Sequence, residues 1–202
     1  TMLLSATGCS GGTGVGGLKN IQANDKVTND EAAILVTGDD YPLTVRDYLD
    51  LETVIDTVPQ RVAVLSGTPL NIWYDLGGKS ICTSDVTDNV RLTEGYEDEI
   101  RSLPMIGPVY SVDMESIIGH EPDLIIAQVG TQSTQASKLR DMGYNVIQTH
   151  IRGFSDVLDT YRAFGKILGQ SELAETRIAE LEQGKKEITD KLPDDDISVV
   201  IL

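Results

Sequence analysis

The chain has 202 residues, of which 40% are hydrophobic and 24% are charged. This balance is typical of a folded globular protein and excludes a chain that is disordered throughout. The longest apolar runs have about five or six residues, whereas a membrane-spanning helix needs roughly 18 or more, so no such helix is expected.

The charge balance is strongly acidic, with 32 Asp and Glu residues against 16 Lys and Arg residues and a formal net charge of -16 at pH 7. Proteins that bind nucleic acid carry a basic surface. No basic cluster is visible in the sequence, so we expect no nucleic-acid partner. The acidic excess either keeps the protein soluble or forms a face that docks a basic partner.

Residues 2–9 have the pattern of the end of a secretory signal peptide, because two leucines lead into small residues and then Cys9. The segment resembles a bacterial lipobox, in which the cysteine thiol is acylated and becomes the new N-terminus. Ala6 stands where leucine is commoner, and the usual basic segment is missing. The resemblance implies lipidation of Cys9; the alternative is an ordinary N-terminal tail that contains a cysteine by chance.

The glycine-rich stretch after Cys9 matches GxGxxG formally, with Gly12, Gly14 and Gly17 at the required spacing. A dinucleotide-binding loop needs a strand before this motif and a helix after it. Here the signal-peptide remnant precedes it and the polar residues 19–29 follow it, so we reject this interpretation and expect no cofactor. The composition is typical of a flexible tether.

The first predicted elements are two strands, over residues 31–37 and 43–45. Residues 38–42 between them have the composition of a turn, so the two strands are expected to form a hairpin. A linker that ends at Pro59 follows them.

From residue 62 onward, short apolar runs alternate with helical patterns. Residues 62–65 predict a strand that is buried on both faces, as in a parallel sheet. Thr68 is the expected N-cap, and Pro69 the expected first residue, of a helix that extends through residue 76. Further strands are predicted at 80–83, 124–127 and 145–148, and helices near 97–103, at 114–119 with Asp113 as its cap, at 131–142 and at 155–168. This alternation favours an α/β domain with a mainly parallel sheet flanked by helices.

The longest predicted helix covers residues 172–192 and has one apolar and one charged face. Pro193 ends it, and residues 197–202 predict a further strand. A long helix that leads into a new strand indicates the start of a second lobe. We therefore divide the chain into a signal-peptide remnant, lipobox and tether at 1–29, an α/β lobe at 30–170, a linker helix at 171–193, and the first strand of a second lobe at 194–202.

Ligands of open parallel sheets bind beyond the carboxyl ends of the strands. Polar residues follow three of the predicted strands there, at 66–68, 83–85 and 128–131. Hydroxyl groups and free backbone N–H groups at such ends hold carboxylates or ring oxygens. The candidate ligand-binding residues lie at these ends or nearby: Ser66, Gly67, Thr68, Trp73, Tyr110, Gln128, Thr131 and Arg152.

Several of these candidates also have a plain structural alternative. Ser66, Gly67 and Thr68 would also serve a turn and a helix cap, and Trp73 would also serve the core. Tyr110 would stack on a flat ligand. Arg152 would pair with an anionic ligand or lie on the surface.

The sequence contains no recognisable catalytic or metal-binding arrangement. His120 and His150 are far apart, with no third ligand at metal spacing. Ser66 is not in a GxSxG motif. Cys82 lies in an apolar run and is most simply a small buried hydrophobic residue, and no pattern indicates a disulfide between it and Cys9. We therefore expect neither an enzyme nor a direct metal site.

Several stretches together resemble one known family. Residues 58–65 resemble the Pro-x-Arg-Val segment that leads into its first central strand, and residues 75–77 resemble its Leu-Gly helix end. Residues 112–126 resemble its most recognisable segment, a helix with an early Glu followed by Pro-Asp-Leu-Ile, and residues 168–169 match the end of the helix before its long linker helix. The family comprises the substrate-binding proteins of bacterial ABC importers, of the class for ferric siderophores, haem and cobalamin, and the likeness covers residues 41–202.

The resemblance implies a two-lobed α/β fold joined by one long helix, with the N-terminal lobe in this chain. It implies capture of an iron-siderophore-like, haem or corrinoid ligand, with any metal inside its chelator, and delivery to an ABC permease and its ATPase. Glu115 resembles the acidic residue by which a lobe grips an arginine of the permease; stabilising its own helix N-terminus is the alternative.

Together with the lipobox, the family implies a monomer that is anchored to the cell membrane at its extracytoplasmic face. A single-lobe protein with a scaffolding or partner-binding role is the alternative, as is an enzyme on a related two-lobed scaffold.

Overall fold

The computed structural model describes residues 32–88 and 90–192, whose strands form two three-stranded sheets. Cys9, the glycine-rich stretch, Pro193 and the strand predicted at 197–202 lie outside the described residues. Within the described residues, no helix is both long enough and apolar enough to cross a membrane.

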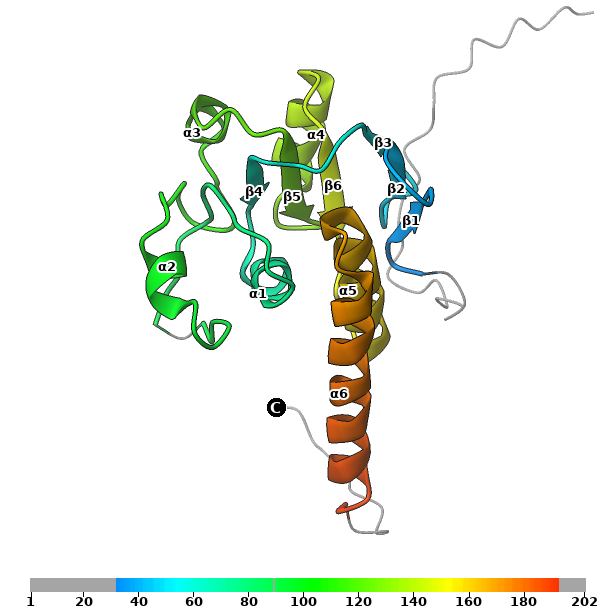
Figure 1. The fold of residues 1–202 in the computed structure, drawn as a ribbon. Coiled ribbons are helices and arrows are strands. Elements are labelled where there is room, and N and C mark those ends of the chain that lie inside the picture. Colours follow the sequence, from blue (N-terminus) through cyan, green and yellow to red (C-terminus); the bar gives the residue numbers. More distant parts are fainter. Residues whose placement is uncertain (1–31, 89, 193–202) are drawn as a thin grey trace, which may run out of the picture. The chain divides into compact units, whose positions relative to one another are not determined.

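The central sheet is parallel and has the order β4–β5–β6 (Figure 1). It consists of β4 (Val62–Val64), β5 (Leu124–Gln128) and β6 (Val146–Thr149). All of these residues except Gln128 are buried, and the prediction that the strand near residues 62–65 is covered on both faces is thereby confirmed.

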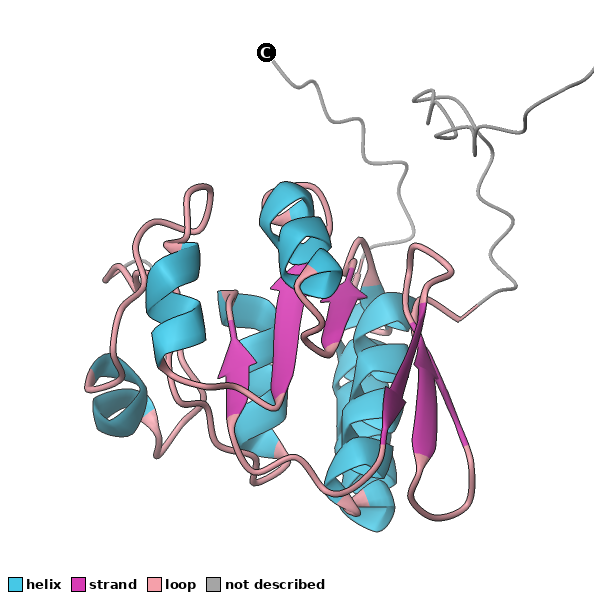
Figure 2. Cartoon of the chain, turned by 90° about the horizontal axis from the view of Figure 1, so that it is seen from above, coloured by secondary structure: helices cyan, strands magenta, loops and turns pink. Residues whose placement is uncertain are grey.

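Successive residues of each central strand contribute to two different hydrophobic cores, because side chains alternate between the faces of a sheet. Leu124 and Ile126 of β5 belong to the larger core, whereas Ile125 and Ala127 belong to the smaller one. Figure 2 shows helices on both sides of the parallel strands. The chain is therefore a layered α/β domain, as its sequence predicts.

The helices divide between these two cores. The larger core contains residues of α1 (Gly67–Asp75), α5 (Phe154–Leu168) and α6 (Ser171–Thr189), together with Ile100 of the short α2 (Glu97–Arg101). The smaller core contains residues of α3 (Met114–Gly119) and α4 (Ser133–Asp141). The predicted helices are all present, with ends that differ by a few residues. Asp113 caps α3 as predicted, since its Oδ1 accepts a hydrogen bond from the Glu115 N–H at 3.0 Å.

The N-terminal sheet is antiparallel, with β1 (Leu35–Thr37), β2 (Leu43–Arg46) and β3 (Glu52–Ile55) in that order. The predicted hairpin is confirmed. Strand β3 was not predicted, because its sequence does not separate a polar from an apolar face. The buried face carries Thr53 and Ile55, and the exposed face carries Glu52 and Val54. Thr53 is buried nonetheless, and its hydroxyl donates to the Val146 carbonyl oxygen at 2.9 Å.

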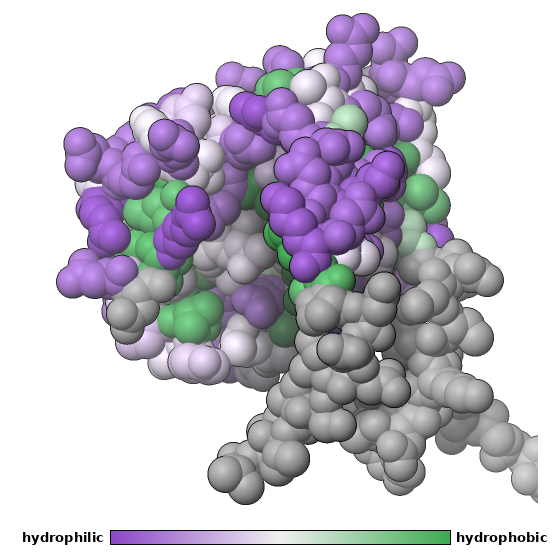
Figure 3. All heavy atoms as spheres, turned by 90° about the horizontal axis from the view of Figure 1, so that it is seen from below, coloured by the Kyte–Doolittle hydropathy of each residue, from purple (hydrophilic) through white to green (hydrophobic). Residues whose placement is uncertain are grey.

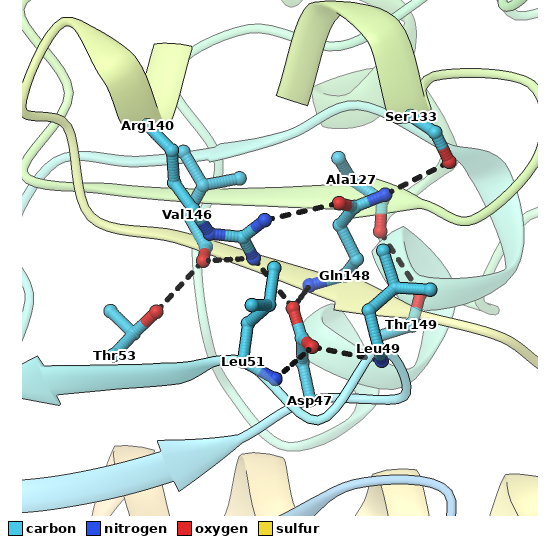
Figure 4. Close-up of polar contacts among 10 residues, drawn as sticks. All are labelled: Asp47, Leu49, Leu51, Thr53, Ala127, Ser133, Arg140, Val146, Gln148 and Thr149. Carbon is cyan, nitrogen blue, oxygen red and sulfur yellow. Dashed lines mark hydrogen bonds and ion pairs between the residues drawn. The ribbon is translucent and has the colours of Figure 1, made fainter. Parts of the chain in front are cut away.

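A buried polar network connects the two sheets (Figure 4). The Asp47 carboxylate accepts hydrogen bonds from the backbone N–H groups of Leu49 and Gln148, at 2.9 and 3.0 Å, and forms an ion pair with Arg140 at 2.5 Å. Arg140 also donates to the Val146 carbonyl oxygen at 2.8 Å. These bonds hold the turn after β2 against β6 and α4.

The strand predicted at 80–83 is wrong. The Ser80 hydroxyl, rather than a backbone carbonyl, accepts the bond from the Val64 N–H at 2.9 Å, so the side chain interrupts a regular ladder beside β4. Thr83 forms only an isolated parallel bridge with Met105. The segment follows the edge of the sheet without becoming a strand.

The predicted start of the first helix is also wrong. Ser66, and not Thr68, is the N-cap of α1, and Pro69 is the third helical residue rather than the first. The first and the third position of a helix both accept proline, because the first N–H groups of a helix have no intrahelical partner. The shift brings Gly67 and Thr68 into the first turn.

Candidate functional site

A pocket of about 450 Å³ lies at the carboxyl ends of β4 and β5, beside the first turn of α1. This is the edge where ligands of parallel sheets bind. Polar and apolar residues from four segments line it: Ser66, Gly67, Thr68, Asn71, Ser84, Asp85, Val86, Thr87, Val90, Arg91, Val109 and Gln128.

The start of α1 forms one wall of this pocket. The Ser66 hydroxyl donates to Gln128 Oε1 and makes no capping bond to its own helix. The first N–H groups of α1, which belong to Gly67 and Thr68, have no intrahelical partner. They carry the positive end of the helix dipole, so this wall suits an anionic or oxygen-rich group.

Gln132 holds the strand ends in place and is fully buried. Its amide nitrogen donates to the Leu65 and Val109 carbonyl oxygens at 2.6 and 3.3 Å, and its Oε1 accepts from the Gln128 N–H at 2.9 Å. Gln132 thus joins β4, β5 and the loop before α3. Sequence reasoning missed it, because a glutamine in a polar stretch carries no pattern that marks it as buried.

The opposite wall is the segment from Ser84 to Arg91. Its backbone is tied to the rest of the domain by the Asp85 N–H, which donates to the Gly107 carbonyl oxygen at 2.9 Å. Val90 packs beside the first turn of α1, since a Cβ added at Gly67 would lie 3.4 Å from Val90 Cγ1. The sequence predicted residues 83–85 at this edge, but it gave no signal for Val90 or Arg91.

Four of the predicted ligand-binding residues line the pocket: Ser66, Gly67, Thr68 and Gln128. Tyr110 follows the lining residue Val109 and has 74% of its surface exposed, but it is not itself among the lining residues. Thr131 is not among the lining residues, and its buried hydroxyl has no hydrogen-bond partner.

Trp73 does not contribute to the pocket, so its selection is wrong. Only 1% of its surface is exposed, and its ring packs edge-on against Phe164 with centroids 5.2 Å apart. Its indole N–H donates to the Lys79 carbonyl oxygen at 3.1 Å. The core alternative is the one that the structure adopts, because this position of α1 faces α5.

Arg152 also lies outside the pocket lining. Its guanidinium forms two bonds with the Asp156 carboxylate, at 2.9 and 3.0 Å, and lies 5.0 Å from the centre of the Tyr48 ring. Tyr48 also contacts the His150 ring, with centroids 4.4 Å apart. Burial, followed by the nearby positive charge of Arg152, lowers the pKa of His150. The surface alternative therefore describes Arg152, whose partner Asp156 lies in the first turn of α5.

A larger and more open groove of about 1010 Å³ adjoins the pocket, and the two share Asn71 and Arg91. It runs between the segment from Arg91 to Glu97 and residues of α5 and α6. Figure 3 shows this side of the molecule hollowed between hydrophilic residues. The groove lies away from the strand ends, so we place the candidate site in the smaller pocket.

Cys82 is a buried core residue, as predicted, and burial raises the pKa of its thiol to about 11. Glu115 is exposed in the first turn of α3. Among residues 32–88 and 90–192, no group of three His, Cys, Asp or Glu side chains is arranged to hold a metal ion.

Residues 62–202 match the family described as periplasmic binding protein. This match covers well over half of the chain, and the chain belongs to that family. The family resemblance and the α/β fold class predicted from the sequence are thereby confirmed.

The chain is also similar to two curated proteins. An uncharacterized ABC transporter substrate-binding lipoprotein of Bacillus subtilis, YvrC, is 24% identical over 155 residues, which are 75% of this chain and 48% of that protein. A cobalamin-binding protein of Halobacterium salinarum is 24% identical over 157 residues, which are 77% of this chain and 42% of that protein. The chain spans about half the length of the curated relatives it matches.

A solved structure agrees with the fold. SirA of Staphylococcus aureus, complexed with staphyloferrin B, is 20% identical and has a TM-score of 0.58. The likeness covers 74% of this chain and 53% of that one.

Proposed function

We propose that this chain is part of the substrate-binding component of an ABC importer, and that it captures a chelate ligand and delivers it to a permease. The observation that carries the proposal is the pocket at the carboxyl ends of β4 and β5 in a member of the periplasmic binding protein family. Four residues selected from the sequence line it, and the free N–H groups of α1 offer hydrogen bonds to ligand oxygens.

The proposed ligand class is an iron-siderophore-like, haem or corrinoid chelate. Support comes from the named ligands of similar proteins, which are cobalamin for a relative and staphyloferrin B for a structural neighbour. In this proposal the protein binds the metal only through its chelator. In this proposal Tyr110, which is exposed next to the lining residue Val109, stacks on a flat ligand. A binding role, rather than catalysis, follows from the family.

The domain organisation belongs to the same proposal. Residues 30–170 form one lobe, residues 171–193 form the linker helix, and residues 194–202 begin a second lobe that supplies the other half of the cleft. Support comes from α6, which spans Ser171–Thr189, and from the relatives, of which the matched residues cover only 48% and 42%. Half of the ligand contacts would then come from the second lobe.

We further propose that Cys9 is lipidated and anchors a monomeric receptor at the extracytoplasmic face of the cell membrane. The supporting observations are the lipobox resemblance and the description of the Bacillus subtilis relative as a lipoprotein. An anchor would keep the receptor beside its permease and the ATPase of the importer.

Glu115 is the residue that we assign to permease docking. Its carboxylate is exposed on α3, where it is free to accept a bidentate bond from an arginine. Replacing it with lysine would reverse this charge without touching the pocket.

The test measures uptake of a labelled chelate by cells that produce either the intact protein or one of its variants. Glu115→Lys should retain ligand binding and lose most of the uptake. Glu172→Lys is the matched control, because Glu172 is also the second residue of its helix and is also exposed. Equal uptake by the two variants would remove Glu115 from the docking role, and normal uptake without the protein would overturn the importer function.

A further inference from the structure

One segment without helix or strand supplies half of the pocket lining. This wall segment comprises residues 84–88 and 90–93. Because it has no ladder of backbone bonds, individual hydrogen bonds and buried side chains determine its position. Six of the twelve lining residues belong to it: Ser84, Asp85, Val86, Thr87, Val90 and Arg91.

Asn71 of α1 holds the C-terminal end of the wall segment. Its amide nitrogen donates to the Arg91 carbonyl oxygen at 2.8 Å, and its Oδ1 accepts from the Thr93 N–H at 2.9 Å. The Thr93 hydroxyl donates to the Asn71 carbonyl oxygen at 2.9 Å. The side-chain amide thus uses both its donor and its acceptor, and a side chain that lacks either group cannot make both bonds.

The wall segment has few other polar contacts with the rest of the described residues. At its N-terminal end, the Asp85 N–H donates to the Gly107 carbonyl oxygen at 2.9 Å. Its remaining backbone bonds connect residues that are three apart in the sequence. Asp88 forms an ion pair with Arg101 at 3.6 Å, but this pair is exposed, and exposed pairs contribute little. The placement of the C-terminal end therefore depends on Asn71.

Burial alone does not determine how the wall segment lies. Leu92, between the two residues that Asn71 holds, is 8% exposed and belongs to the larger core. Hydrophobic burial is non-directional, whereas a hydrogen bond requires a defined distance and angle. Leu92 therefore keeps the segment on the domain, and the bonds of Asn71 fix its orientation.

Asn71 also connects this wall with the other one. It belongs to α1, whose first turn contributes Gly67 and Thr68 to the pocket, and Asn71 itself is a lining residue. One helix therefore sets the position of both walls. A pocket that is held in its binding shape before the ligand arrives loses less free energy in becoming ordered on binding.

We propose that Asn71 is a positioning residue for ligand binding, because it holds the backbone of residues 91–93 against α1 and so fixes one wall of the pocket. This inference rests on the proposed function and adds a residue that the sequence did not indicate. The effect passes through the backbone of the wall segment, so it does not require contact between Asn71 and the ligand.

The first measurement is amide hydrogen exchange of the intact protein, read by mass spectrometry. Asn71→Ala should raise exchange about tenfold in peptides from the wall segment and leave peptides from β5 and α5 unchanged. Alanine is the better helix former, so this change does not weaken α1 itself. Asn71→Asp should have the same effect, because it keeps the acceptor for the Thr93 N–H but places a carboxylate oxygen against the Arg91 carbonyl oxygen.

The second measurement is calorimetric titration with ferric dicitrate, ferrichrome, haem and cyanocobalamin. For the probe that the wild-type protein binds most tightly, Asn71→Ala and Asn71→Asp should weaken binding about three- to tenfold. A saturating amount of this probe should slow exchange of the wall segment in both variants, because a ligand that binds the ordered wall stabilises it. A role in folding alone would not produce this local recovery.

Asn145→Ala is the matched control. The Asn145 amide also donates to a backbone carbonyl oxygen, that of Asp123 at 3.3 Å, but Asn145 is not among the lining residues of the pocket. This change should leave affinity and exchange of the wall segment as they are. Thr93→Val serves as a second test in case the Asn71 variants unfold, because it removes only the hydroxyl bonds to Asn71 and should have a smaller effect of the same kind.

Two results would overturn the proposal and leave the importer function standing. One is exchange of the wall segment in the Asn71 variants at the wild-type rate. The other is binding of the probe by these variants as tightly as by Asn145→Ala. If no probe binds to the wild-type protein, the proposed binding function is overturned, and the role of Asn71 with it.

Discussion

Asp47 is the single residue on which the joining of the two sheets most depends. Its buried carboxylate has an ion pair with Arg140 and accepts bonds from three backbone N–H groups, including those of Leu49 and Gln148. Removing one partner of a buried pair leaves the other charge uncompensated, which is far costlier than losing an exposed pair.

We predict that Asp47→Ala lowers the free energy of unfolding by about 3–5 kcal/mol, measured by urea denaturation. Asp88→Ala is the control, since Asp88 is exposed and lies 3.6 Å from Arg101, and it should cost less than about 1 kcal/mol. Similar losses for the two variants would contradict a structural role for the network.

Cys82 gives a prediction that depends on pH. Because burial raises the pKa of this thiol from 9.0 to about 11, the reactive thiolate is about a hundredfold scarcer at pH 8 than in a free cysteine. Iodoacetamide should therefore leave Cys82 unmodified in the folded protein at pH 8 and label it after unfolding in urea, as read by peptide mass spectrometry. Rapid labelling of the folded protein would show that the residue is accessible.

Site residues that directly follow a strand could be predicted from the sequence, whereas those that lie in loops could not. Ser66 and Gln128 follow apolar runs, so their place at the carboxyl edge could be predicted. Arg91 lies in a polar stretch without periodicity, and only the bonds from Asn71 bring it to the pocket. Trp73 was selected as a large aromatic, but the face of α1 that carries it packs on the core.

At the scale of elements, the close crossing of α5 and α6 depends on Gly165. A Cβ added there would lie 2.5 Å from the Ala174 Cβ and 3.2 Å from the Gln170 carbonyl oxygen. No rotation of a methyl group relieves contacts this short, so the helices would have to separate.

Gly165→Ala should therefore lower the free energy of unfolding by about 1–3 kcal/mol. Gly184→Ala is the matched control, because Gly184 is a helical glycine of α6 with open space around it. That change should raise stability by about 0.5–1 kcal/mol, since alanine is the better helix former. Thermal or urea unfolding of both variants measures the difference, and a loss in both would argue against the packing explanation.

Elements with a strong periodic or continuous apolar pattern could be predicted, and weakly patterned ones could not. Strands β4 and β5 are apolar throughout, and α5 carries an apolar stripe and ends at Gly169 in a left-handed conformation. Strand β3 alternates polar and apolar residues on both of its faces, so it was not recognised. At residues 80–83 the apolar pattern suggested a strand, but the Ser80 hydroxyl occupies the backbone donor of Val64.

At the scale of the whole molecule, two cores cover the opposite faces of the central sheet, and the candidate site lies at the carboxyl edge of that sheet. This edge carries the pocket and the first N–H groups of α1. In the proposed receptor, a second lobe beyond α6 would complete the cleft around the ligand.

Titration of the intact protein with ferric siderophores, haem and cobalamin is the direct test of the proposed receptor function. Calorimetry is the suitable method, because the single tryptophan of the sequence, Trp73, is buried in the core away from the pocket. We predict that at least one of these chelates binds with one-to-one stoichiometry and a Kd of about 1 μM or tighter, a free energy of about -8 kcal/mol. If none of them binds at concentrations well above this Kd, the chain is not part of a chelate receptor.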